Sequence, residues 1–208
     1  MTRALIVGAG SIGMRHASVI AGMGGQTAFV TARTDLDQPT FASVADAVGG
    51  FEPDYAIVAT ETGMHTKSVG ELAAAGFSGR LLVEKPLAVP LADLSGFSFV
   101  GVGFNLRFHP VIIRLAELLA PEQIYTVESY VGQHLSTWRA DRKVSDQYSA
   151  SRSRGGGVLR DLSHEWDYLS VLFGSCRGLI ARGGRLSEVT EDSDDAWGIL
   201  AEFDRAPV

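Results

Sequence analysis

The sequence predicts an α/β fold: a doubly wound parallel sheet, followed by a small α+β domain with an open, mostly antiparallel sheet. Two observations predict it. Over residues 3–104, short apolar runs of strand length alternate with segments of helical periodicity, which is the order that builds a parallel sheet. From about residue 105 the pattern changes to alternating apolar and polar residues, which is typical of half-exposed strands. We therefore expect two domains, residues 1–104 and 105–208.

The first strand, turn and helix carry the most informative motif. Residues 3–7 (RALIV) form an apolar run, the stretch GAGSIG follows at residues 8–13, and helical periodicity begins there. A strand, a GxGxxG turn and a helix in this order are typical of dinucleotide binding; without a ligand, the stretch would be only a tight turn. The glycines would permit the turn, the approach of a pyrophosphate and close helix packing, and the first N–H groups of the helix would bind phosphate. The residues expected to contact the dinucleotide here are Gly8, Gly10, Ser11, Ile12 and Gly13.

The end of the second strand, predicted over residues 27–32, bears on the choice of cofactor. In a dinucleotide fold, the residue about twenty positions past the turn faces the adenosine ribose. Arg33, beside the hydroxyl of Thr34, suits the 2′-phosphate of NADP because a guanidinium binds such anions through two N–H groups. Alternatively, Arg33 lies in solvent and Asp35 binds the ribose 2′-hydroxyl of NAD. We predict NADP, with NAD as the alternative.

The remaining strands of the first domain bring further polar residues to the same edge. Strands are predicted over residues 55–60, 79–83 and 99–104, with helices over 41–48 and 65–75. Glu84, Lys85 and Pro86 directly follow one of these strands, and the proline cannot continue it. Because parallel strands end at one edge of a sheet, we expect Lys85 to extend from that edge towards the position of the nicotinamide.

The second domain combines helices, strands and a long loop. Residues 137–154 form a polar loop, and loops of that length are usually functional. Its arginines make it locally basic, which would suit a phosphate or carboxylate on the substrate. The expected substrate contacts are Arg107, Trp138, Arg139, Arg152 and Arg154. Helices are predicted over residues 110–119 and 158–173, strands over 123–135, 178–186 and 196–203, and a solvated acidic turn over 188–195.

Composition argues against several classes of protein. The chain has 208 residues, of which 46% are hydrophobic and 20% charged, so it can bury a sizeable core. A net charge of −6 argues against a nucleic-acid partner, which would need a basic face. No apolar run has the length of a membrane span or of a signal peptide's apolar region. The single Cys176 cannot form an intramolecular disulfide, so we expect a cytoplasmic protein, and we expect no metal site.

Five stretches together resemble one family. GAGSIGMRH, ATETGMH, VEKP, GFNLRFHP and RGGGVLRDLSHEWDYL occur in the order found in the glucose-fructose oxidoreductase / inositol dehydrogenase (Gfo/Idh/MocA) family. The resemblance implies a Rossmann domain followed by an α/β domain with an open, mostly antiparallel sheet. It also implies an NAD(P)-dependent oxidoreductase that acts on CH–OH groups of sugars, sugar nucleotides or cyclitols. The stretch GGGVLRDLSHE is most similar to the corresponding stretch of members from bacterial surface-sugar biosynthesis.

The resemblance also implies roles for single residues. Lys85 matches the family's catalytic lysine, which polarises the reacting hydroxyl, and His164 matches the usual proton acceptor. Asp161 precedes His164 by three positions where many members have four, and either spacing would place both on one helix face. Removing a hydride from a carbinol also requires a proton acceptor that titrates near neutrality, which suits His164. The other matches are Thr60 and His65, which would line the nicotinamide ribose with Glu84 and Pro86 nearby, and Asn105 and Arg107, where the interdomain strand passes the active site.

The second domain is shorter than is usual in that family. The strands that would complete its sheet are absent from the sequence pattern, and an exposed strand edge invites pairing with another chain. We therefore expect a homodimer or higher homo-oligomer formed through this sheet. A catalytically weakened dinucleotide-binding sensor or subunit is the alternative function. A non-redox Rossmann protein such as a methyltransferase would leave Lys85 and the start of the helix near His164 without a role.

Overall fold

A computed structural model describes residues 1–87, 93–138 and 143–206 of the chain. The chain divides into two compact units, unit 1 (Met1–Gly103) and unit 2 (Phe104–Val208), and each is described by itself. Among the described residues, no helix is long and apolar enough to cross a membrane. In the same part of the chain, no group of three or more His, Cys, Asp or Glu side chains is arranged to hold a metal ion.

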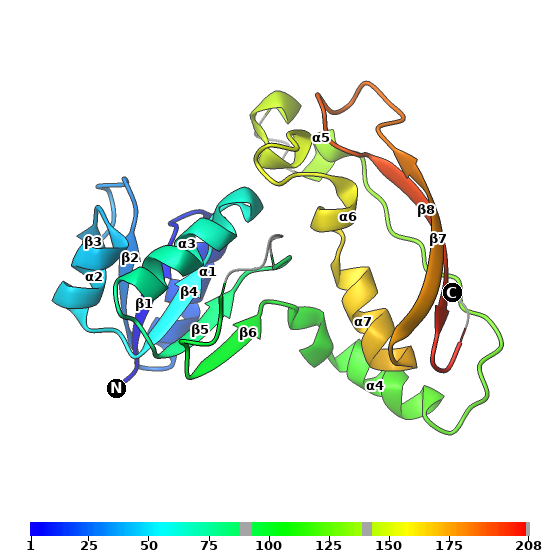
Figure 1. Ribbon diagram of the computed structural model, residues 1–208, viewed down its shortest axis with the longest axis horizontal. Coiled ribbons are helices and arrows are strands. Elements are labelled where there is room, and N and C mark those ends of the chain that lie inside the picture. Colours follow the sequence, from blue (N-terminus) through cyan, green and yellow to red (C-terminus); the bar gives the residue numbers. More distant parts are fainter. Residues whose placement is uncertain (88–92, 139–142, 207–208) are drawn as a thin grey trace. The chain divides into compact units, whose positions relative to one another are not determined.

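Unit 1 is built on a six-stranded parallel sheet with the strand order β3-β2-β1-β4-β5-β6 (Figure 1). The order changes direction at β1, so the crevice between the ends of β1 and β4 is the topological switch point, where such sheets bind ligands. The sheet is that of a Rossmann fold, as predicted. Its strands are β1 (Arg3–Val7), β2 (Gln26–Val30), β3 (Thr40–Phe41), β4 (Tyr55–Val58), β5 (Arg80–Val83) and β6 (Phe99–Val102).

Alternate side chains of these strands fill two separate cores. Leu5, with its neighbours on one face, packs with residues of α2 (Val44–Phe51) and α3 (His65–Ala74). Ile6, on the opposite face, packs with Ala17 and Ile20 of α1 (Ser11–Gly22). Because both faces are covered, the central strands read as continuous apolar runs rather than as alternating patterns. This burial fixes the ends of β1, β4 and β5, where the polar residues of the candidate site begin.

Unit 2 joins helices to a two-stranded antiparallel sheet, which agrees with the predicted class of this part. Its core lies between α4, α7 and the sheet, and includes Leu169, Phe173 and Phe203. The helices are α4 (Pro110–Leu119), α5 (Leu135–Trp138), α6 (Val158–Asp161) and α7 (His164–Phe173), and the strands are β7 (Cys176–Gly184) and β8 (Ala196–Phe203). Single 3-10 turns are η1 (Thr62–Met64) in unit 1 and η2 (Asn105–Phe108), η3 (Val144–Asp146) and η4 (Tyr148–Ala150) in unit 2.

The strand predicted over residues 123–135 is wrong. Residues 123–134 form neither helix nor strand, and Leu135 begins the short helix α5. The apolar side chains of Ile124 and Val127 pack against the unit 2 core, but the backbone around them does not pair with β7 or β8. The alternating pattern therefore reflects one buried side of an irregular segment, and alternation by itself does not supply a partner strand.

The continuous helix predicted over residues 158–173 is also wrong. The backbone leaves helical geometry at Leu162, which has φ −99° and ψ 25°, so α6 ends at Asp161 and α7 begins at His164. The predicted placement of Asp161 and His164 on one face of a single helix therefore does not hold. The break spans only Leu162 and Ser163, and helical spacing of apolar residues continues on both sides of it, which is why the sequence pattern did not reveal it.

Candidate functional site

The glycine turn after β1 is closed on one side and open on the other. Gly8 has φ +103°, and a Cβ there would lie 2.8 Å from the carbonyl oxygen of Ala59 at the end of β4. A Cβ at Gly13 would lie 2.1 Å from the carbonyl oxygen of Gly8, so only glycine lets α1 approach the turn this closely. A Cβ at Gly10 would meet nothing within 4 Å. The turn thus leaves open space at the one glycine where the sequence predicts an approaching pyrophosphate.

The N-terminus of α1 points its first N–H groups into this turn. Gly10 occupies the N-cap position, and no side chain caps the helix. Helix α1 has 12 residues and no acidic side chain in its first turn, so the partial positive charge of this end is not offset locally. Ser11 and Ile12 are both exposed there. An uncapped helix end beside an open glycine is chemically suited to a pyrophosphate group.

Arg33 and Asp35, the two candidates for the ribose contact, are bound to each other. Arg33 donates from Nε to Asp35 Oδ1 at 2.9 Å and from Nη2 to Oδ2 at 2.7 Å. Its Nη1 donates to the carbonyl oxygen of Ala9 at 3.0 Å, which ties the guanidinium to the glycine turn. The hydrogen bonds from Arg33 lower the pKa of Asp35, and the same pairing raises the pKa of Arg33. Thr34 lies between them and is exposed.

Thr60 and His65 lie beyond the end of β4 and differ in accessibility. Thr60 Oγ1 is buried and has no hydrogen-bond partner among the described residues. His65 is only 1% exposed, and its ring contacts two carbonyl oxygens, Nδ1 to Pro86 at 3.0 Å and Nε2 to Thr60 at 3.1 Å. The ring of His65 therefore binds the backbone of the strand-end segments, whereas Thr60 offers a buried hydroxyl that a ligand could satisfy.

Glu84 is held by a residue that sequence reasoning did not include in the site. His16 Nε2, on α1, lies 2.8 Å from Glu84 Oε1, and both side chains are largely buried. His16 follows Gly13 by three positions, so the helical period already placed it on a face near the turn. Lys85 comes next in the chain, and the Lys85–Pro86 peptide bond is cis. The predicted site residues of unit 1 thus meet at the carboxyl edge of the sheet, around the switch point.

In unit 2, Asp161 and Trp138 line one cavity of about 250 Å³. Asp161 is 7% exposed and accepts a hydrogen bond of 2.8 Å from the hydroxyl of Tyr148. His164 begins α7 beyond the break, and its ring meets that of Phe104 edge-on at 5.8 Å between centroids. Asp161 thus faces a cavity together with one predicted substrate residue.

Arg107 has a structural partner. Its Nε donates to both carboxylate oxygens of Asp167, at 2.9 and 2.8 Å, and Nη2 also donates to Oδ1. Asp167 is buried on α7, so this pair fastens η2, which begins at the exposed Asn105, to that helix. The pairing raises the pKa of Arg107. A substrate anion would have to compete with Asp167 for this guanidinium.

The acidic segment 188–195, predicted to be a solvated turn, is an ordered set of hydrogen bonds. Asp194 Oδ2 accepts from the backbone N–H of Leu159 at 3.2 Å and from Trp197 Nε1 at 3.0 Å, which fixes the start of α6. Asp195 is partly desolvated, yet its pKa is lowered because Leu186 and Ser187 donate hydrogen bonds to it. These carboxylates therefore hold backbone segments of unit 2 in place.

The acidic segment 188–195 also contacts the predicted substrate loop, residues 137–154. Asp192 Oδ1 accepts from the backbone N–H of Arg152 at 2.7 Å, and Arg154 Nη1 donates to the carbonyl oxygen of Asp146 at 3.3 Å. The Arg152 side chain is exposed. Arg139, the remaining predicted substrate residue, lies outside the described residues.

Comparison with known proteins places these features in context. Residues 2–98 match the model of the Gfo/Idh/MocA group, described as an oxidoreductase family with an NAD-binding Rossmann fold. No curated protein matches the chain.

Solved structures resemble the whole chain. The WlbA dehydrogenase from Bordetella pertussis, in complex with NADH and UDP-GlcNAcA, has a TM-score of 0.76 at 21% identity over 99% of this chain and 70% of its own. The WlbA (WbpB) dehydrogenase from Thermus thermophilus, with NAD and alpha-ketoglutarate, gives 0.71 at 20% identity, over 100% and 72%. Biliverdin reductase from Synechocystis sp. PCC 6803, with biliverdin and NADP+, gives 0.72 at 18%, over 100% and 71%. At these identities the likeness establishes the fold.

Proposed function

Because residues 2–98 match the model of the Gfo/Idh/MocA family of NAD-binding oxidoreductases, we propose that the protein transfers a hydride between a nicotinamide and a sugar-type hydroxyl or ketone. The observation that carries this proposal is the turn at residues 8–13. It joins a helix end without a capping side chain to a glycine with open space around it. The buried, unpartnered hydroxyl of Thr60 lies at the neighbouring strand end and adds a polar group that a dinucleotide could satisfy. The residues present therefore fit the cofactor.

The chemistry divides among three residues. The bound nicotinamide would supply the acceptor or donor of the hydride. In the oxidation direction, the carbinol carbon loses a hydride while the hydroxyl proton passes to the His164 imidazole. The Lys85 ammonium donates a hydrogen bond to the same oxygen and stabilises its developing negative charge. Asp161 is a third candidate in unit 2, where it would contact the substrate from the cavity that it shares with Trp138. Glu84, Pro86 and Asn105 are proposed to contact the cofactor around these groups.

We propose a sugar, sugar nucleotide or cyclitol as the substrate class, with an anionic group. The Bordetella pertussis dehydrogenase binds UDP-GlcNAcA, which carries such groups. In this chain, Arg152 presents an exposed side chain from the predicted substrate loop, and Arg154 lies near it. Arg107 and Arg139 are the other proposed contacts of this kind. A cytoplasmic location, without a nucleic-acid or membrane partner, fits small-molecule redox chemistry.

We propose NADP as the preferred cofactor and NAD as the alternative. Arg33 supports NADP because its guanidinium is anchored on Ala9 of the turn. Fluorescence titrations with NADPH and NADH are expected to show tighter NADPH binding, and Arg33→Ala is expected to weaken NADPH binding by about tenfold, the usual value of a charge-assisted contact. Asp35→Ala is the matched control, and it should not weaken NADPH binding. Tighter binding of NADH that is lost in Asp35→Ala would assign the ribose contact to Asp35 instead.

A sensor or subunit without turnover is the second candidate function. The break between Asp161 and His164 favours it, because the two residues do not share one helix face. A panel of polyols, sugars and sugar nucleotides distinguishes the two functions. Turnover of any of them with NAD(P) supports the enzyme, whereas cofactor binding without turnover on the whole panel supports the sensor.

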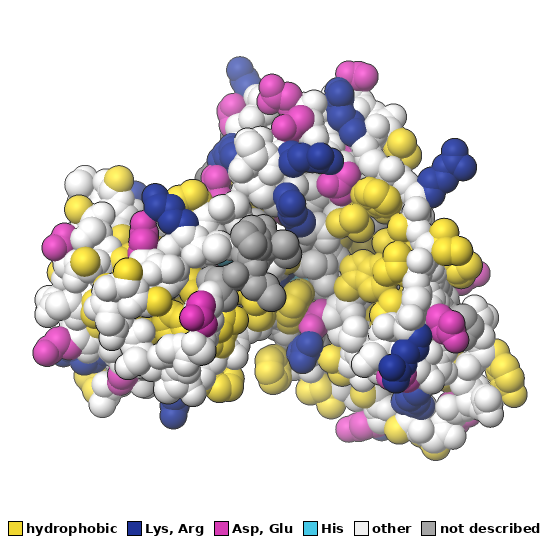
Figure 2. Space-filling view, in the orientation of Figure 1, with side chains coloured by type: hydrophobic (Ala, Val, Ile, Leu, Met, Phe, Trp, Pro, Cys, Tyr) yellow, Lys and Arg dark blue, Asp and Glu magenta, His cyan; other side chains and the backbone are white. Residues whose placement is uncertain are grey.

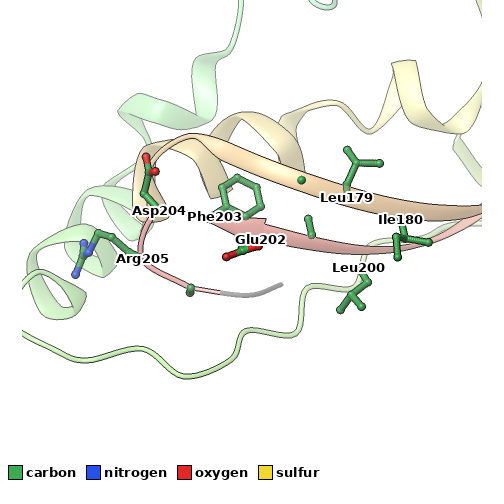
Figure 3. A pocket seen from close by; sticks show the side chains of 10 residues that line it. Leu179, Ile180, Leu200, Glu202, Phe203, Asp204 and Arg205 are labelled. Carbon is green, nitrogen blue, oxygen red and sulfur yellow. The ribbon is translucent and has the colours of Figure 1, made fainter.

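We further propose that the protein is a homodimer or higher homo-oligomer formed through the sheet of unit 2. Figure 2 shows hydrophobic side chains over this sheet, and Ile180 and Leu200, which pair across β7 and β8, are 75% and 65% exposed. They line a cavity of about 540 Å³ whose residues are drawn in Figure 3. Each of the two strands has only one neighbour in the described sheet, so each also presents a free edge.

Light scattering after size exclusion tests the oligomer. The wild type is expected to have at least the mass of a dimer at micromolar concentration. Ile180→Lys is expected to raise the dissociation constant by about tenfold or more, since it places a charge in an apolar interface. Val19→Lys, at an exposed apolar position of α1, is the control and should leave the mass unchanged. A monomeric wild type would contradict the proposal.

A further inference from the structure

We propose that His16 and His65 are positioning residues for Lys85, which they fix by holding the residues on either side of it. This inference rests on the proposed function, in which Lys85 acts on the substrate oxygen. Glu84 is bound by His16 from α1, and Pro86 is bound by His65 from α3. Lys85 is thus the central residue of a tripeptide whose two outer members are each bound by a histidine.

The contact on the Glu84 side is formed by three elements. His16 Nε2 lies 2.8 Å from Glu84 Oε1, with 23% and 16% of the respective side chains exposed. A Cβ at Gly103 would lie 3.0 Å from both carboxylate oxygens, so glycine at that position makes room for the carboxylate. The backbone N–H of Glu84 also donates to the carbonyl oxygen of Val58 at 2.9 Å. Both the side chain and the backbone of Glu84 are therefore fixed.

The contact on the Pro86 side is made by one buried ring. His65 Nδ1 lies 3.0 Å from the carbonyl oxygen of Pro86, and Nε2 lies 3.1 Å from that of Thr60. Carbonyl oxygens only accept hydrogen bonds, so the ring donates to Pro86 in the tautomer that carries its proton on Nδ1, and this is the tautomer on which the inference depends. The ring joins the segment after β5 to the end of β4, across the switch point. With 1% of His65 exposed, water does not compete for these contacts.

This arrangement matters because a lysine side chain is long and has many rotamers. Its ammonium can be placed reliably only if the backbone from which it extends is fixed. Misplacement of a catalytic group by about 1 Å can lower a rate by about a hundredfold. Neither histidine needs to touch the substrate for its loss to affect the reaction. His16 and His65 therefore affect the reaction by fixing the backbone from which Lys85 extends.

Amide substitutions can separate the individual contacts. The side-chain nitrogen of glutamine reaches the approximate position of a histidine Nε2, and that of asparagine the position of Nδ1. His16→Gln should preserve the contact with Glu84, whereas His16→Leu removes it. His65→Asn should preserve the contact with Pro86, and His65→Gln should preserve only the contact with Thr60. We therefore expect the position of Lys85 to stay closer to that of the wild type in His16→Gln and His65→Asn than in His16→Leu and His65→Gln.

A chemical readout tests the inference without requiring turnover. The chain has three lysines, so competitive amine labelling with mass spectrometry can follow Lys85 while Lys67 and Lys143 serve as internal references. In variants that keep the far-UV spectrum and thermal transition of the wild type, His16→Leu and His65→Gln are expected to change the labelling rate of Lys85 by about threefold or more. This change should be small in His16→Gln and His65→Asn, since amide groups can restore the hydrogen bonds. Equal Lys85 rates in all folded variants would overturn the inference.

A double-mutant cycle then separates positioning from a general structural effect. His16→Leu is expected to lower kcat by about 10- to 100-fold in the wild-type background, and by less than about twofold in the Lys85→Ala background. An equal loss in both backgrounds would overturn the inference, because His16 would then act independently of Lys85. If the wild type binds no NAD(P)H and turns over no substrate, the proposed function fails, but the labelling experiment still decides whether the histidines fix Lys85.

Discussion

Replacing Lys85 with alanine is expected to lower kcat by about a thousandfold, the usual cost of removing a group that stabilises charge in the transition state. The ammonium would interact most strongly with the substrate oxygen as it becomes an alkoxide, so the effect should fall mainly on kcat. Affinity for NAD(P)H should change by less than about tenfold, because the glycine turn and the start of α1 provide the phosphate contacts. Steady-state kinetics and a cofactor titration measure both quantities.

Lys67→Ala is the matched control for this variant. Lys67 lies on α3, is exposed, and pairs only loosely with Glu71 at 3.7 Å. An ion pair of this kind contributes little, so Lys67→Ala should behave as the wild type. A Lys85→Ala variant that retains wild-type kcat would remove Lys85 from the proposed mechanism.

Gly10 and Gly13, three positions apart in the turn, are expected to respond in opposite ways to the same substitution. Gly13→Ala would place a methyl group 2.1 Å from the carbonyl oxygen of Gly8, and should destabilise unit 1 by about 3 kcal/mol. Gly10→Ala meets no atom within 4 Å, and its φ of −75° and ψ of −174° suit any residue, so thermal stability should barely change. Its methyl group would instead occupy the space needed by a pyrophosphate, and should weaken NAD(P)H binding by about tenfold or more.

Thermal unfolding without cofactor and a fluorescence titration separate these two effects. If Gly13→Ala does not accumulate as folded protein, Gly10→Ala still tests the cofactor site. A Gly10→Ala variant that binds NAD(P)H as tightly as the wild type would show that the cofactor does not approach this glycine. A Gly13→Ala variant as stable as the wild type would contradict the close packing of α1 on the turn.

The sequence was most informative where structure depends on local pattern. Residues 3–7 and 55–58 are strands buried on both faces, so nearly every residue in them is apolar and the assignment is direct. The glycine turn was equally clear, because the spacing of its glycines reflects the backbone conformation and the close helix packing that the turn requires. His16 was missed although it lies within the same motif, because nothing local indicates that Glu84, 68 positions away, is its partner.

Unit 2 was harder to predict because its elements depend on distant partners. The alternation over residues 123–135 recorded which side chains are buried, but pairing depends on a neighbouring strand that the segment does not have. The acidic segment was taken for a solvated turn because free carboxylates prefer water. Asp194 and Asp195 instead accept hydrogen bonds from backbone groups up to 35 positions away, which no local pattern records.

The pairing of Arg33 with Asp35 has a consequence for how cofactor preference could evolve or be redesigned. Both residues lie on the surface, with 44% and 67% of their side chains exposed, and neither belongs to a core cluster of unit 1. Substitutions there change the charge that meets the adenosine end of a dinucleotide without disturbing the packing of the sheet. The preference for NAD or NADP can therefore change by mutation, or be redesigned, with little effect on the folding of unit 1.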